Sequence, residues 1–263
     1  MAHQLDHVVF NTRFETDDAA HLFEGLGFQL TPRGFHPTLG SINHLMVFEH
    51  DYLELIGLPP GGAIVRQELI DSPTGINGLV FASKDATATR EDAVDRGFDA
   101  QPVQNFSRPL VIDGAEHEAS FSAVRLALDS FAAGRVYFCQ HRTPELIWRR
   151  EWMAHPNGAT AITELTIASG DPVATCEHYA RLGDIAGDFK LTVVDAAALA
   201  DRFGELAEIG ADRPERFAAV TVRSRDPQIA AQRAAALGLP HSAAAGRVVV
   251  ALPALDSLIE FIA

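Results

Sequence analysis

The stretch LDHVVFNTRFETDDAAHLFEGLGF, residues 5–28, decides the fold. Most of residues 5–12 are apolar or β-branched, which predicts a strand. An amphipathic helix follows, and Gly27 supplies the left-handed conformation that ends many helices. The same order of strand, helix and closing glycine begins again near residues 76, 162 and 217. Four copies of one unit predict a fold built from related modules.

The spacing within the four units is nearly constant, because each closing glycine follows the third residue of its strand by 19 or 20 positions. The strands cover 5–12, 76–83, 162–169 and 217–224, their third residues are His7, Gly78, Glu164 and Ala219, and the glycines are Gly27, Gly97, Gly183 and Gly238. Each helix also begins near an aspartate that can accept hydrogen bonds from free backbone amides. These expected caps are Asp17 or Asp18, Asp85, Asp171 and Asp226.

Later strands complete the units, although the third unit has a single clear one and then a helical insertion near 196–208. Their ranges are 43–49 and 52–57, then 119–128 and 135–140, then 189–194, and finally 247–252 and 258–262. The expected fold class is α+β, with four βαβββ modules in two pseudo-symmetric halves, the C-terminal half being degenerate. We predict domains over 1–145 and 156–263, joined by the segment 143–158.

Composition narrows the function classes. The chain has 263 residues, a formal net charge of −14 and 47% hydrophobic residues, a globular balance that disfavours nucleic acid as a partner. No apolar run approaches the length of a membrane span, so we expect no membrane insertion. The first residues lack a basic stretch followed by an apolar one, and we therefore expect a cytoplasmic protein. The two cysteines, Cys139 and Cys176, form no metal-binding motif.

The run Leu5 to Val9, the helix end Gly25 to Phe28 and the strand Tyr52 to Leu55 together resemble the opening module of vicinal oxygen chelate proteins, especially the glyoxalase-like domain family. The resemblance implies that paired modules curve around a cavity and hold a divalent metal ion such as Zn, Ni, Mn or Fe on their first and last strands. It also implies a lyase, isomerase or dioxygenase acting on a small substrate with two neighbouring oxygens. A homodimer is a further expectation. A metal-free protein that binds or sequesters a small molecule is the alternative, because the fold does not fix the chemistry.

The resemblance places His7 and Glu54 in the metal-ligand positions of the first module, and we expect their polar tips within about 3–5 Å of each other in one cavity. Gly78 leaves the matching position of the second module without a ligand. On the last strand of that module, Gln140 aligns with Glu54, while His141 lies one residue further. Because side chains alternate along a strand, we expect only one of the two to face the cavity. We favour His141, giving a set of two histidines and one carboxylate. Glu54 or His141 would then act as the catalytic base.

In the second half, Glu164 and Glu260 occupy ligand-like positions, but Ala219 does not, and we expect this half to be structural. Pairing of the first module with the fourth would instead bring Glu260 towards His7. Three arginines, Arg108, Arg149 and Arg150, are expected nearest the cavity mouth, where a guanidinium would suit a carboxylate or phosphate; ordinary surface solvation is the competing interpretation.

Overall fold

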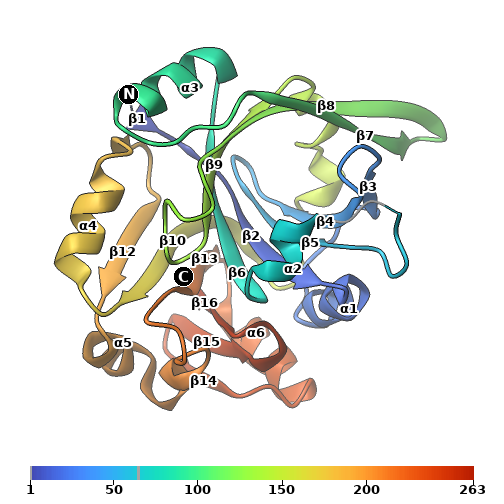
Figure 1. Cartoon of the computed structure of the whole chain (residues 1–263). Coiled ribbons are helices and arrows are strands. Elements are labelled where there is room, and N and C mark those ends of the chain that lie inside the picture. Colours follow the sequence, from blue (N-terminus) through green and yellow to red (C-terminus); the bar gives the residue numbers. More distant parts are fainter. Residues whose placement is uncertain (1, 64–65) are drawn as a thin grey trace.

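The computed structural model describes residues 2–63 and 66–263 and shows an α+β fold dominated by curled sheet (Figure 1). The larger sheet has eight strands in the order β3-β4-β5-β2-β6-β9-β8-β7. Their bounds, in that order, are Gly34–His36, Ser41–Val47, Tyr52–Gly57, Leu5–Arg13, Gly75–Ala82, Arg135–His141, Ala115–Arg125 and Gln104–Ile112. The α+β class predicted from the sequence is confirmed.

The eight-stranded sheet consists of two similar halves that meet at its centre. Strand β2 lies antiparallel to β6, β5 lies parallel to β2, and β9 lies parallel to β6. The first half runs β2-α1-β3-β4-β5 and the second runs β6-α3-β7-β8-β9, with α1 at Thr16–Gly25 and α3 at Ala86–Asp95. The first and second units therefore share this sheet, and the alternative pairing of the first with the fourth does not occur. Strand β7 was not predicted.

The remaining units form a six-stranded sheet, β12-β10-β13-β16-β15-β14. Its strands, in that order, are Lys190–Val194, Ala159–Ser169, Glu215–Ser224, Ser257–Ile262, Arg247–Leu252 and His241–Ala244. Helices α4 (Pro172–Ala180) and α6 (Pro227–Ala236) follow β10 and β13, while α5 (Ala196–Phe203) lies in the predicted helical insertion.

Three of the four predicted helix caps are present. Asp85 accepts from the amides of residues 87 and 88, Asp171 from that of residue 174, and Asp226 from that of residue 228. The prediction is wrong for α1, which begins at Thr16 and has no side-chain cap. Asp17 and Asp18 lie inside its first turn, where a negative charge still interacts favourably with the helix dipole.

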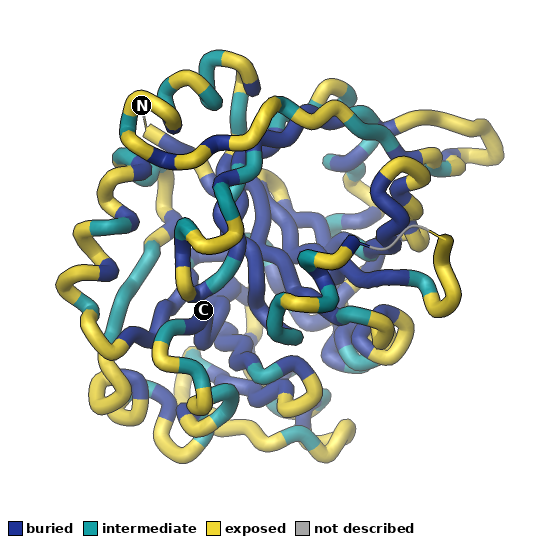
Figure 2. The backbone as a smooth tube through the Cα atoms, in the orientation of Figure 1, coloured by how far each residue is buried: buried dark blue, intermediate teal, exposed yellow. Residues whose placement is uncertain are grey.

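The segment 143–158 carries the chain from one sheet to the other and is largely packed. Ile147 is fully buried, Trp152 is 9% exposed, and Asn157 donates to the carbonyl of Leu26. One continuous set of buried apolar side chains extends over both sheets and the helices α1, α3, α4 and α6. Figure 2 shows that buried positions run along the strands at the centre of the molecule. The two-domain division stays a prediction, and the shared core shows that the halves pack as partners.

A short strand ties the two halves together at the start of the chain. Strand β1 (Ala2–His3) pairs in parallel with β11 (Asp184–Ile185), and His3 Nε2 lies 2.8 Å from the carbonyl oxygen of Leu182. In the described part of the chain, no helix has both the length and the apolar character needed to cross a membrane.

Candidate functional site

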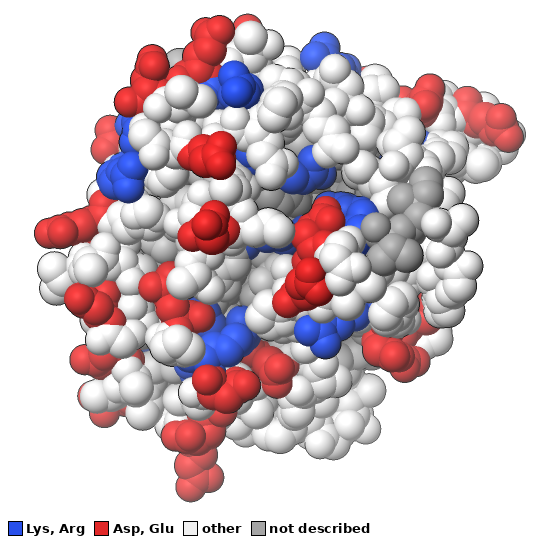
Figure 3. All heavy atoms as spheres, viewed as in Figure 1, with Lys and Arg blue, Asp and Glu red and all other residues white. Residues whose placement is uncertain are grey.

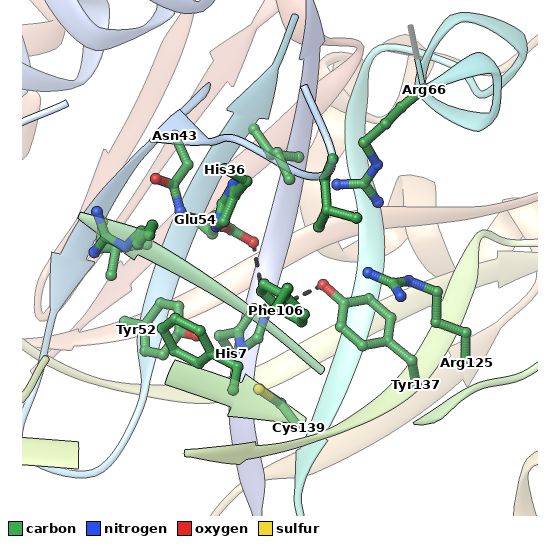
Figure 4. Close-up of a pocket in the computed structure, with 15 residues that line it drawn as sticks. His7, His36, Asn43, Tyr52, Glu54, Arg66, Phe106, Arg125, Tyr137 and Cys139 are labelled. Carbon is green, nitrogen blue, oxygen red and sulfur yellow. Dashed lines mark hydrogen bonds and ion pairs between the residues drawn. The ribbon is translucent and has the colours of Figure 1, made fainter. Parts of the chain in front are cut away.

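A buried polar cavity lies on the face of the eight-stranded sheet that points away from the main core (Figure 4). Alternation along the strands sends Val8 and Leu53 into the core and turns His7 and Glu54 to the cavity. His7 is 3% exposed and Glu54 is 7% exposed. Tyr137, on the neighbouring half of the sheet, completes the central group.

A β-bulge positions Asp6 beside His7. The pairing of β2 with β6 passes from Leu5↔Phe81 directly to His7↔Val80, which leaves Asp6 as an extra residue on the bulged strand. His7 Nδ1 lies 2.5 Å from Asp6 Oδ1, and His141 Nε2 lies 3.1 Å from the same oxygen. Burial alone would raise the pKa of Asp6, but the two imidazoles outweigh it and hold that pKa well below its usual range.

The orientation imposed by Asp6 directs His7 Nε2 towards Glu54. The distance from His7 Nε2 to Glu54 Oε2 is 3.6 Å, and the hydroxyl of Tyr137 is 3.2 Å from the same nitrogen. Asn43 Nδ2 donates to the other carboxylate oxygen, Glu54 Oε1, at 2.6 Å. The ring of Tyr52 stacks on His7 with centroids 4.3 Å apart. One oxygen of Glu54 is thus held in place and the other faces the imidazole.

Gln140 and His141, the two alternative metal ligands on β9, point in opposite directions. Gln140 accepts from the amide of Ala86 and donates to the carbonyl of Lys84, so its side chain binds the start of α3 and lies away from the cavity. His141 shares the face of His7, but its Nε2 is directed at Asp6. The predicted ligand set of His7, Glu54, His141 and Gln140 therefore does not converge on one point.

The strand register explains why Gln140 was misplaced. His7 lies opposite Tyr52 and Val9 opposite Glu54, whereas on the second half Gly78 lies opposite Arg135 and Val80 opposite Tyr137. Since Gly78 is the counterpart of His7, the counterpart of Glu54 is Tyr137, three residues before Gln140. Burial raises the pKa of Tyr137 well above its usual range, so this position holds a neutral phenol.

Arginines form much of the remaining cavity wall, and most of them were not predicted. Arg66, Arg108 and Arg125 line the cavity, and Arg108 is only 2% exposed. Of the arginines predicted to lie near the cavity mouth, Arg108 lines the cavity, whereas Arg149 pairs with the exposed carboxylates of Asp113 and Glu151. Arg125 continues the alternation that turns Phe121 to the cavity and could have been found from it, but the sequence around Arg66 has no such alternation.

Buried polar groups at the cavity have unusual properties. Burial lowers the pKa of His36 to about 4, with Arg108 and Arg66 opposing protonation further and Glu54 favouring it. Asn43 Oδ1 and Arg108 Nη2 have no hydrogen-bond partner among the described residues. Because buried polar atoms are nearly always satisfied, such a group of them is typical of a site that receives a ligand or solvent.

In the six-stranded sheet, the corresponding position is filled by the protein itself. Arg202 of α5 donates to Glu164 Oε1 at 2.6 Å and to Glu260 Oε2 at 2.5 Å. Arg247 donates to Glu260 Oε1 at 2.5 Å. Glu260 is 1% exposed, so the two guanidinium groups balance a carboxylate that water does not reach.

Comparisons with known proteins agree with this fold. A family model described as a glyoxalase-like domain matches residues 5–183. A hypothetical protein from Staphylococcus aureus superposes with a TM-score of 0.63 at 11% identity, covering 98% of each chain. A mutant of 4-hydroxymandelate synthase from Streptomyces coelicolor gives 0.61 at 12% identity, covering 99% of this chain and 92% of that one.

A fusion of a xylose isomerase-like TIM barrel with 4-hydroxyphenylpyruvate dioxygenase gives a TM-score of 0.57 at 12% identity, covering all of this chain and 49% of that one. At these identities the likeness concerns the fold. A search of curated proteins finds no match.

Proposed function

We propose that the eight-stranded sheet holds the active site of an enzyme acting on a small substrate with neighbouring oxygens. The chain belongs to the glyoxalase-like domain family of the vicinal oxygen chelate superfamily. The observation that carries the proposal is the facing pair His7 Nε2 and Glu54 Oε2, 3.6 Å apart in a buried cavity. The names of two structural neighbours, a 4-hydroxymandelate synthase and a 4-hydroxyphenylpyruvate dioxygenase fusion, support a small oxygen-bearing substrate.

The reaction best suited to this pair is proton transfer next to a carbonyl. Glu54 Oε2, free of its neighbour Asn43, would accept the proton from a carbon adjacent to the carbonyl, and the electron pair of that C–H bond would move onto the carbonyl oxygen as an enediolate or enolate. His7 Nε2 would exchange a proton with an oxygen of the substrate, because Asp6 holds the Nδ1 proton. The Tyr137 hydroxyl and the arginine wall would stabilise the negative oxygen.

The donor set does not fit the three-ligand metal site predicted from the resemblance. A catalytic metal centre commonly has three protein ligands. Of the predicted ligands, only His7 and Glu54 face each other in the described structure. A second group, formed by Asp6, Cys139 and His141, has one ligand atom from each residue within 4.8 Å of the others. Tyr137 is a neutral phenol, Gln140 faces α3 and His141 binds Asp6. We therefore assign no catalytic step to an ion.

A metal-dependent form of the same function is the second candidate. One observation favours it: a carboxylate on Nδ1 is the arrangement by which many metal-bound histidines are oriented. Metal analysis of protein purified without chelators tests it, with His7→Ala and Glu54→Ala compared with His50→Ala, whose side chain is 70% exposed. Stoichiometric metal lost in both cavity variants, and retained in the control, would establish it.

Deuterium exchange tests the proposal for proton transfer. Wild-type protein in D₂O should exchange the carbon-bound proton of at least one member of a panel of 2-hydroxy ketones and 2-oxo acids, followed by proton NMR. Glu54→Gln should slow this exchange by at least about 100-fold, since general-base catalysis contributes about 10²–10⁴. Glu49→Gln, at an 82% exposed side chain, is the matched control.

Binding of a panel member without exchange would refute the enzyme and favour the small-molecule binding protein. The homodimer and the cytoplasmic location remain predictions.

A further inference from the structure

A second hollow adjoins the cavity and shares its wall. Leu39, Arg66, Arg125 and Tyr137 line both, and Arg135 lines the outer one. In the space-filling view, basic side chains lie inside a hollow near the centre of the molecule, with acidic ones around it (Figure 3). The two compartments thus share one wall, and the outer one is lined by three arginines.

The charges in the outer compartment do not balance. Arg66 Nε donates to Glu68 at 2.8 Å, which pairs one guanidinium with a carboxylate. Arg135 Nε instead donates to the amide oxygen of Asn77, and Arg125 donates to the amide oxygen of Gln104. Within residues 2–63 and 66–263, neither of these two arginines forms an ion pair.

The buried position makes this imbalance costly. Arg135 is 9% exposed, and its Nη2 has no hydrogen-bond partner in the described structure. Burial lowers the pKa of Arg135 to about 10, and the nearby charges of Arg66 and Arg125 lower it further against the opposing effect of Tyr137. Like charges held together out of water favour the binding of a counter-anion.

Tyr137 connects the outer compartment to the reacting pair. Its hydroxyl lies 3.2 Å from His7 Nε2, and the guanidinium of Arg125 lies 5.8 Å from the centre of its ring. Figure 4 shows the side chains of Arg66 and Arg125 next to Tyr137, on the side away from Asn43. A group bound by these arginines is therefore one side chain away from His7.

We propose that the substrate carries an anionic end, either a carboxylate or a phosphate monoester, which binds Arg125, Arg135 and Arg66 while its oxygen-bearing carbon reaches Glu54 and His7. The proposal rests on the proposed function, whose substrate class it specifies. The planar guanidinium group can donate two parallel hydrogen bonds to either oxyanion. Lysines in the same positions would make weaker and less directional contacts, which accounts for the presence of three arginines.

Calorimetric titration with inorganic phosphate and with benzoate tests the anion site separately from catalysis. At least one probe should bind, and Arg125→Gln should weaken it by about tenfold or more, the loss expected for one charge-assisted contact. Arg125→Lys should weaken it less, because the charge remains, and exposed Arg225→Gln should leave it unchanged. Circular dichroism checks that each variant is folded.

The outcomes distinguish the two ideas. Glu54→Gln should still bind the anion while losing proton exchange, so failure of exchange alone refutes the proposed function and leaves the anion site standing. Phosphate or benzoate as the only bound probe assigns that oxyanion. Binding of neither probe, equal affinity in Arg125→Gln and wild type, or an equal loss in Arg225→Gln would overturn the inference.

Discussion

Replacing Asp6 with asparagine removes one negative charge from a buried position while keeping the shape of the side chain. Asp6 is 2% exposed and accepts from two imidazoles, those of His7 and His141. Hydrogen bonds to a charged group contribute about 1.5–3 kcal/mol and neutral ones about 0.5–1.5 kcal/mol. Losing the charge from two such bonds should lower the free energy of unfolding at neutral pH by about 2–3 kcal/mol.

The stability difference between wild type and Asp6→Asn should depend on pH in a defined direction. The pKa of Asp6 is lowered in the folded protein, so its stabilisation is fully present above the unfolded value of about 3.9 and is lost as the pH falls towards the folded value. The difference in stability between wild type and Asp6→Asn should therefore be constant near neutrality and should shrink below about pH 4. Urea unfolding at a series of pH values measures it.

Asp51, in the turn between β4 and β5, provides a control whose stability should change with pH in the opposite direction. Burial raises its pKa to about 7, and its carboxylate accepts from the amide of Ile162, a contact that an asparagine oxygen can also make. The folded protein keeps a proton that the unfolded chain releases between about pH 4 and 7, so wild type loses stability over this range and Asp51→Asn does not.

Asp6→Asn should also slow proton exchange by at least about tenfold, since the amide can donate to His7 Nδ1 and displace its proton. An Asp6→Asn variant as stable as wild type, or one that matches Asp51→Asn at every pH, would refute the reasoning.

Three further predictions concern other parts of the molecule. Arg202→Met should lower the free energy of unfolding in urea by about 3 kcal/mol, because it strips a partner from the buried carboxylate of Glu260; an unchanged midpoint would contradict this. Wild type should gain stability from about pH 4 to 6.5 relative to His36→Gln, since His36 with a pKa of about 4 stays neutral while its unfolded form is charged; parallel stability curves would rule this out. Gly75→Ala should lower the melting temperature markedly, because Gly75 has a φ of +92° and a Cβ there would lie 1.8 Å from the Leu255 carbonyl oxygen; wild-type melting would show that the contact can relax.

The sequence predicted the fold well because the four units repeat local patterns that each fix a strand, a helix and its end. The strand beginning at Leu5, the caps at Asp85 and Asp171, and the closing glycines all depend on a few neighbouring residues. These patterns also turned His7 and Glu54 to the same face.

The site was predicted less well because it depends on contacts between distant segments. The bulge at Asp6 comes from the pairing of β2 with β6, and the placement of Tyr137 opposite Val80 comes from the pairing of β6 with β9. Neither register is visible along one strand. Arg202 reaches Glu260 from an inserted helix, and no local sequence pattern predicts that contact.

The pairing of β1 with β11 also bears on the order in which the protein is made. Ala2 and His3 leave the ribosome long before Asp184 and Ile185, the residues with which they pair. At about 5–20 residues per second, the delay is on the order of 10–40 s. During that interval the His3 imidazole lacks its acceptor at Leu182, although its aromatic neighbours Phe81 and Phe138 are synthesised before Leu182. The first residues of the chain are therefore among the last to reach their native position, and a growing chain would present them to chaperones or to a fused tag until the third unit emerges.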